Sequence, residues 1–128
     1  MELLRRLELV PHPASVGIAR RFVGDCLGDW GLEAGDDVSP LVVSELVTNA
    51  LQHASGPITL IVARRLDRVV LSVQDGSDLR VDLDPYPADP MGESGRGLGL
   101  VATLSEAWGE QALDHGKRVW AEVLPSPR

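Results

Sequence analysis

The chain alternates between segments with helical spacing of apolar residues and short segments rich in β-branched residues. A loosely alternating run over residues 3–10 stops at Pro11 and Pro13, which predicts a strand. Over residues 14–30, apolar side chains recur at three- and four-residue spacing, and Gly31 follows directly. This pattern predicts an amphipathic helix with a glycine stop.

A second helix is predicted from residues 36–39 to about residue 54. Capping residues and Pro40 suit its first turn, and Gly56 and Pro57 end it. Its apolar and polar residues fall on opposite arcs of the helix. The polar arc consists of Glu45, Thr48, Asn49, Gln52 and His53, and the apolar arc of Val43, Leu46, Val47, Ala50 and Leu51. Taken alone, such a polar arc is typical of a solvent-facing surface.

Two β-rich runs, residues 58–64 and 68–74, predict an antiparallel hairpin linked around Asp67. In the second run the two-residue period places Asp75 on the same apolar side as Val69, Leu71 and Val73. A buried carboxylate needs a partner, because burial without one costs several kcal/mol or forces protonation. Asp75 therefore either caps the Asp-Gly-Ser turn or accepts a hydrogen bond from a ligand.

A long polar stretch over residues 77–94 contains Pro85, Pro87 and Pro90 and predicts a lid rather than a regular element. It leads into a glycine-rich loop over residues 95–100, followed by a short helix to about residue 107. Alternate glycines allow close backbone approach, and a helix N-terminus offers free amides to an anion. The segment is therefore a candidate phosphate site.

The C-terminal part predicts two more strands, residues 108–113 and 118–124, separated by a turn over residues 114–117. The order of elements indicates an α+β fold with a mainly antiparallel mixed sheet and helices on one face. A chain of 128 residues fits a single domain, and we find neither an internal repeat nor a linker.

Composition and charge narrow the function classes. With 44% hydrophobic and 24% charged residues, the chain can bury a core. A net charge of −7 with scattered arginines disfavours direct binding of nucleic acid but not of ATP. Apolar runs are too short to span a membrane and no apolar signal segment follows Met1, so we expect a cytoplasmic protein. Cys26, the single cysteine, excludes an internal disulfide and is expected to be a small buried hydrophobe.

Two common glycine motifs do not fit residues 95–100. A Walker-type phosphate loop needs Lys-Ser or Lys-Thr after the last glycine, where Leu100 and Val101 stand. A dinucleotide-binding fingerprint should follow the first strand of a parallel unit, whereas this segment lies near the C-terminus. Both alternatives are disfavoured.

The ordered motifs resemble the histidine-kinase/Hsp90-type ATPase superfamily, and specifically the small anti-sigma-factor serine kinases abundant in actinobacteria. Residues 45–53 (ELVTNALQH) are similar to the N box of that superfamily. Residues 73–75 (VQD) are similar to the start of its first glycine box, and residues 95–100 (GRGLGL) to its second. The resemblance covers nearly the whole chain.

The resemblance implies a two-layer α/β sandwich in which ATP lies between the helices and a lid. It implies that Asn49 binds Mg²⁺, that Asp75 accepts a hydrogen bond from the adenine amine and that Glu45 is the general base. The implied phosphate segment consists of Gly97, Leu98 and Gly99, which contact phosphates through backbone amides, with Gly95 and Arg96 as a hinge and charge contact. His53 would either touch the phosphates or sit on the helix surface.

The resemblance also implies a function. The expected protein is an ATP-dependent serine/threonine kinase that binds a sigma factor in one state and phosphorylates an anti-sigma-factor antagonist in the other. An alternative is a nucleotide-gated binding module without kinase activity. A third is an interaction domain that has lost nucleotide binding, because Ser77 stands where the family usually has a glycine and Arg118 where it often has a threonine. A homodimer would suit the resemblance, but the sequence leaves the oligomeric state open.

Overall fold

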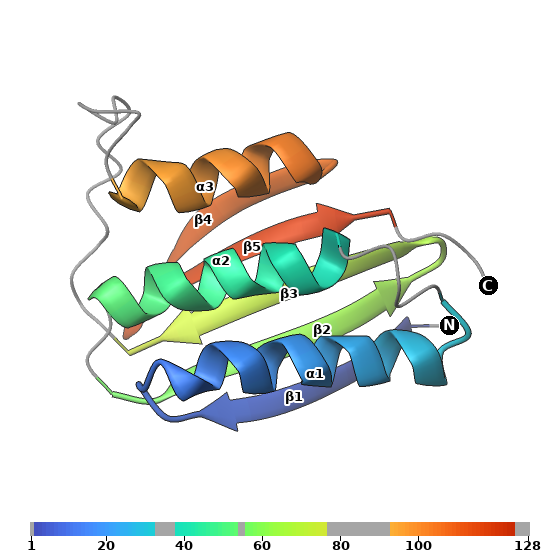
Figure 1. Ribbon diagram of the computed structural model, residues 1–128, viewed down its shortest axis with the longest axis horizontal. Helices are drawn as coiled ribbons and strands as arrows, with labels where there is room; N and C mark the ends of the chain where they lie inside the picture. Colours follow the sequence, from blue (N-terminus) through green and yellow to red (C-terminus); the bar gives the residue numbers. More distant parts are fainter. Residues whose placement is uncertain (1, 33–37, 54–55, 77–92, 125–128) are drawn as a thin grey trace.

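A computed structural model describes residues 2–32, 38–53, 56–76 and 93–124. The predicted order of elements is confirmed (Figure 1). The elements are β1 (Glu2–Leu9), α1 (Ala14–Asp29), α2 (Val38–His53), β2 (Ile58–Arg65), β3 (Arg68–Asp75), α3 (Glu93–Leu104), β4 (Ala107–Leu113) and β5 (Gly116–Val123). The expected lid falls on residues 77–94, of which 77–92 lie outside the described residues.

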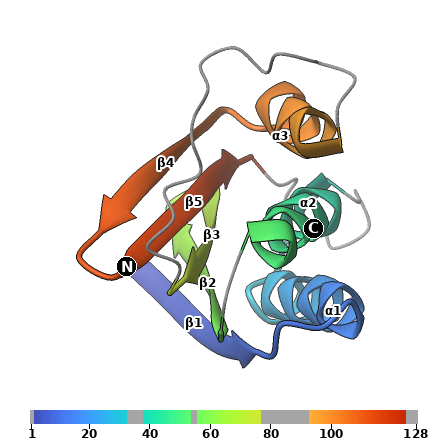
Figure 2. The ribbon, with the colours of Figure 1, turned by 90° about the vertical axis from the view of Figure 1, so that its left-hand side faces the viewer.

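The five strands form one sheet in the order β1-β2-β3-β5-β4. Each neighbouring pair is antiparallel, so the sheet formed by the described residues is antiparallel throughout rather than mixed. Figure 2 shows all three helices on one face of the sheet, with α2 between α1 and α3. The molecule is the predicted two-layer α/β sandwich.

The core fills the space between the helices and the sheet. Alternate residues of the strands point toward the helices and are buried, as the two-residue period requires. On the helix side, Cys26, Leu27 and Leu46 are at most 1% exposed, and Cys26 is the small buried residue that the sequence predicted. Because α2 packs on both neighbouring helices and on the central strands, its position is fixed from several sides.

Helix α1 ends as its sequence predicts. Gly31 has a φ of +72°, which glycine adopts without steric cost, and the Leu32 amide donates to the Leu27 carbonyl at 2.8 Å. Arg64 Nη1 also donates to the Trp30 carbonyl at 2.6 Å, which ties the end of α1 to β2. The end of the helix is therefore held both locally and from the sheet.

The glycine-rich segment differs from its prediction. It was expected to be a loop before a helix ending near residue 107, but Gly95 to Leu100 lie inside α3, and Ala107 already belongs to β4. Tertiary packing explains the difference, because Leu98 and Leu104 pack against the core cluster and Val101 is fully buried within it. This packing offsets the poor helix propensity of the glycines. Among the described residues, no helix has the length and apolar character needed to cross a membrane.

Candidate functional site

The predicted site elements meet at one end of the molecule. Figure 1 shows the C-terminal ends of α2 and β3, the start of β5 and the N-terminal end of α3 at the same end of the sandwich. Asn49, Asp75 and the glycines of α3 belong to these segments. The fold thus gathers residues that are far apart in the sequence.

Helix α2 places Glu45 and Asn49 one turn apart. Asn49 is only 4% exposed and Glu45 is half-buried, whereas Gln52 at the same helix end is exposed. The polar arc is therefore not the uniformly solvent-facing surface that its pattern suggests, since α3 packs on α2 on the side away from α1. A buried amide needs hydrogen-bond partners, so Asn49 is better suited to a binding role than a residue on a solvated face.

Asp75 is the last residue of β3 and is 5% exposed. It continues the buried row of Val69, Leu71 and Val73, which confirms that it lies on the apolar side of the strand. Its neighbour across the sheet is Lys117 of β5. In an antiparallel pair, directly opposed side chains point to the same face, so Asp75 and Lys117 lie side by side beneath the helices.

Gly116 fixes the backbone around Asp75. Its φ is +108°, and a Cβ atom at this position would collide with the carbonyl oxygen of Asp75. Glycine is therefore required for both its conformation and its lack of a side chain. The sequence pattern predicted a turn at Gly116, whereas Gly116 is the first residue of β5. Its contact with Asp75 depends on strand pairing, which the local pattern does not indicate.

Lys117 is the functional candidate that the sequence analysis missed. It is 1% exposed, and its Nζ atom has no hydrogen-bond partner among the described residues. Burial lowers the pKa of Lys117, while the charges of Asp75 and Glu110 oppose that shift. A signal was present, because the two-residue period of the buried Val119 and Ala121 extends back to Lys117.

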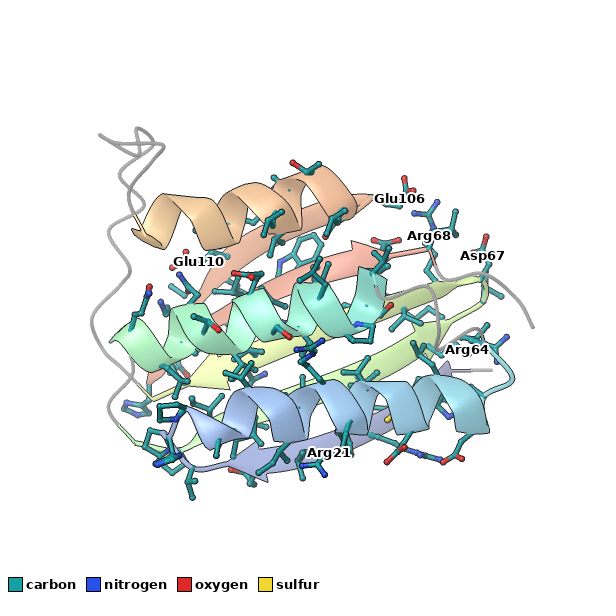
Figure 3. The ribbon with its side chains drawn as sticks, viewed as in Figure 1. Arg21, Arg64, Asp67, Arg68, Glu106 and Glu110 are labelled. Atoms are coloured by element: carbon teal, nitrogen blue, oxygen red, sulfur yellow. The ribbon has the colours of Figure 1, made fainter. Side chains whose placement is uncertain are left out.

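Glu110 of β4 completes this charged cluster. It is directly opposite Val119, so it points to the helix face, and Figure 3 shows it at the same end of the molecule as the end of β3. Burial raises the pKa of the Glu110 carboxyl, Lys117 lowers it and Asp75 raises it further. The site thus combines two carboxylates with one ammonium group in a poorly hydrated environment.

Arg118 lies on the face of the sheet that points away from the helices. By the resemblance, Arg118 stands where the family often has a threonine that supports the adenine contact. The residues of β5 alternate, however, and Arg118 lies on the opposite face from Lys117. It is opposite Gln74 on one side and Gln111 on the other. The residue directly opposite Asp75 is therefore Lys117 and not Arg118.

The remaining predicted residues belong to helices. Gly95, Arg96, Gly97, Leu98 and Gly99 lie in the first two turns of α3, and His53 is the last residue of α2. The side chains of His53 and Arg96 lie outside the described part of the structure. Thr103 Oγ1 donates to the Gly99 carbonyl at 2.9 Å. In this helical conformation the amides of Gly97 to Gly99 face the preceding helical turn, which limits their access to a phosphate.

The residues present fit a magnesium ion that uses few protein ligands. In the described residues there is no group of three or more His, Cys, Asp or Glu side chains that could hold a metal by itself. Mg²⁺ usually keeps several waters and takes phosphate oxygens together with one or two protein oxygens. The buried Asn49 amide can supply such an oxygen.

The chain is similar to one known protein family. A model of the protein family described as the histidine kinase-like ATPase domain matches residues 9–122. A search of curated proteins found no match. The matched region runs from the end of β1 into β5, so it contains Asn49, Asp75 and the glycines of α3.

Proposed function

The chain belongs to the histidine kinase-like ATPase family, whose domains bind ATP, and from this premise we propose that it is an anti-sigma-factor serine/threonine kinase. It binds a sigma factor in one state and phosphorylates a serine of a small antagonist protein in the other. Transcription is then controlled by the exchange of partners. The alternative function is a nucleotide-gated binding module, in which ATP controls the binding of a partner protein and no kinase reaction takes place.

One observation supports the nucleotide site most strongly. Asn49 and Asp75 are at most 5% exposed, and both lie at the end of the sandwich where α3 begins. In such a poorly hydrated place, hydrogen bonds to a ligand are stronger than they are in water. The Asp75 carboxylate is suited to accept a hydrogen bond from the adenine amine. The Asn49 amide is suited to bind Mg²⁺ beside the phosphates.

The proposed phosphate contacts require a change in α3. The first four amides of a helix have no partner within it, so the first turn, at Glu93 to Arg96, can meet an anion directly. Gly97, Leu98 and Gly99 lie one turn further and would have to leave the helical conformation to offer their amides. Three glycines in this helix make such unwinding inexpensive, since each is about 1 kcal/mol less favourable than alanine.

Glu45 has the position expected of the general base. It lies one helical turn before Asn49, so a hydroxyl near the metal-bound phosphates would come within its reach. The carboxylate takes the proton from the attacking serine hydroxyl, which increases the nucleophilicity of the oxygen as it attacks the terminal phosphoryl group. Its side chain is partly exposed, as contact with a substrate protein would require.

The test is the substitution Glu45→Ala, with Gln52→Ala as a control on the exposed part of the same helix. Glu45→Ala should abolish phosphoryl transfer to a cognate antagonist while ATP affinity, measured by calorimetry, stays close to that of the wild type. Gln52→Ala should retain both. Full phosphoryl transfer by Glu45→Ala would refute the assigned base. If the wild type binds ATP but phosphorylates no candidate antagonist, the binding module without kinase activity is favoured.

A further inference from the structure

The side chain of Lys117 lies at the nucleotide site but has no assigned role. Among the described residues it is the largest side chain that is fully buried, and its Nζ atom has no hydrogen-bond partner among them. A lysine ammonium has three donors and no acceptor, and leaving it unsatisfied in the interior is costly. Such a group is explained most simply by a ligand atom that accepts its hydrogen bond.

The register of the sheet defines which part of the ligand Lys117 can reach. Lys117 and Asp75 are directly opposed across β3 and β5, and both point toward the helices. Their Cβ atoms are therefore about 5 Å apart. A ligand that contacts the Asp75 carboxylate must pass beside the Lys117 ammonium.

The edge of adenine matches this pair chemically. Its 6-amino group donates hydrogen bonds, and it is flanked by ring nitrogens that only accept them. An ionised carboxylate accepts only, and an ammonium donates only. Adjacent acceptor and donor side chains thus complement adjacent donor and acceptor atoms of the base.

We propose that Lys117 is a second base-recognition residue of the site. Its Nζ atom donates a hydrogen bond to a purine ring nitrogen, next to the amine whose hydrogen bond Asp75 accepts. This inference rests on the proposed ATP binding and adds a specificity residue to it. Because Asp75 and Lys117 are both nearly inaccessible, the base must displace neighbouring atoms to reach them. The competing explanation is a purely structural ion cluster of Lys117 with Asp75 and Glu110. The charges of both carboxylates act on Lys117, but its Nζ atom has no hydrogen-bond partner among the described residues.

The two explanations are separated by nucleotide analogues that lack one ring nitrogen. The full chain is titrated by calorimetry with ATP, 1-deaza-ATP and 7-deaza-ATP in the presence of Mg²⁺. If Lys117 donates to the base, one of the two analogues binds the wild type roughly 10- to 100-fold more weakly than ATP, the range for a hydrogen bond to a charged group. The analogue that loses affinity identifies the nitrogen.

Two variants assign the effect to Lys117. In Lys117→Met, which removes the charge and keeps a long unbranched side chain, the preference for ATP over that analogue should disappear. Arg118→Met is the matched control, because Arg118 is adjacent in β5 but lies on the other face, and it should keep the preference. A preference that persists in Lys117→Met would overturn the inference.

The wild-type titrations are decisive even if Lys117→Met does not fold. Equal affinity for the three nucleotides would overturn the role of Lys117 and leave the proposed ATP binding intact. Absence of binding by all three would overturn both the proposed function and this inference.

Discussion

Gly116→Ala should damage both the stability of the protein and its nucleotide site. Gly116 has a φ of +108°, and an added Cβ would collide with the carbonyl oxygen of Asp75. The substitution therefore has two costs. The first is the backbone conformation, which an L residue adopts at a cost of about 1–3 kcal/mol. The second is the collision, which forces β3 and β5 apart where Asp75 and Lys117 are paired.

Gly56→Ala separates these two costs. Gly56 has a φ of +102°, close to that of Gly116, but a Cβ there would meet no atom of the described residues within 4 Å. Both variants thus carry a similar backbone cost, and only Gly116→Ala carries the collision. Because overpacking typically costs about 1–3 kcal/mol, Gly116→Ala should be less stable than Gly56→Ala by roughly that amount.

The measurements are urea unfolding for stability and calorimetry with ATP and Mg²⁺ for the site, at a temperature where all variants are folded. Gly116→Ala should bind ATP more weakly because the end of β3 moves. Gly31→Ala serves as the control for binding, since Gly31 also has a positive φ, +72°, and follows α1 outside the site. If Gly116→Ala matches Gly56→Ala in stability and the wild type in ATP affinity, then the contact between Gly116 and Asp75 has no role in holding the site.

Two further predictions concern α3 and Lys117. Gly99→Ala should stabilise the protein by about 0.5–1 kcal/mol and weaken ATP binding roughly two- to five-fold. A Cβ at Gly99 would meet no atom of the described residues within 4 Å, and a more stable helix is harder to unwind. Gly24→Ala in α1 is the control, because a Cβ at Gly24 would also meet no atom of the described residues within 4 Å, and it should raise stability without changing ATP affinity. If Gly99→Ala binds ATP as tightly as the wild type, α3 stays helical on binding. Lys117→Met should be more stable than the wild type at neutral pH by on the order of 1–3 kcal/mol, since it removes a buried charge that has no hydrogen-bond partner in the described part of the chain. Burial lowers the folded-state pKa of Lys117 below its usual 10.5, so the unfolded chain binds more protons between the two values and wild-type stability rises with pH across that window. Thermal unfolding from neutral to alkaline pH should therefore show a decreasing difference in stability between Lys117→Met and the wild type. A difference that does not change with pH would contradict this prediction.

The local pattern of the sequence determined most of the elements. The spacing of apolar residues in α1 and the glycine after it were sufficient, because an amphipathic helix and its stop are local features. The hairpin of β2 and β3 and the inward side of Asp75 also followed, since the two-residue period needs only the strand itself. The candidate residues Glu45 and Asn49 came from the same local pattern combined with the resemblance.

The tertiary structure decided features that depend on distant segments. Asn49 is buried in the folded protein, where α2 packs against two helices and the central strands, and no property of α2 alone indicates those neighbours. The glycines of α3 are helical because the apolar side chains around them pack on the core. Lys117 rather than Arg118 stands beside Asp75, because strand register is set by pairing between residues far apart in the chain. The sequence alone thus supplied the chemical groups and the periodicity that orients them, whereas the long-range packing of strands and helices selected which of those groups meet.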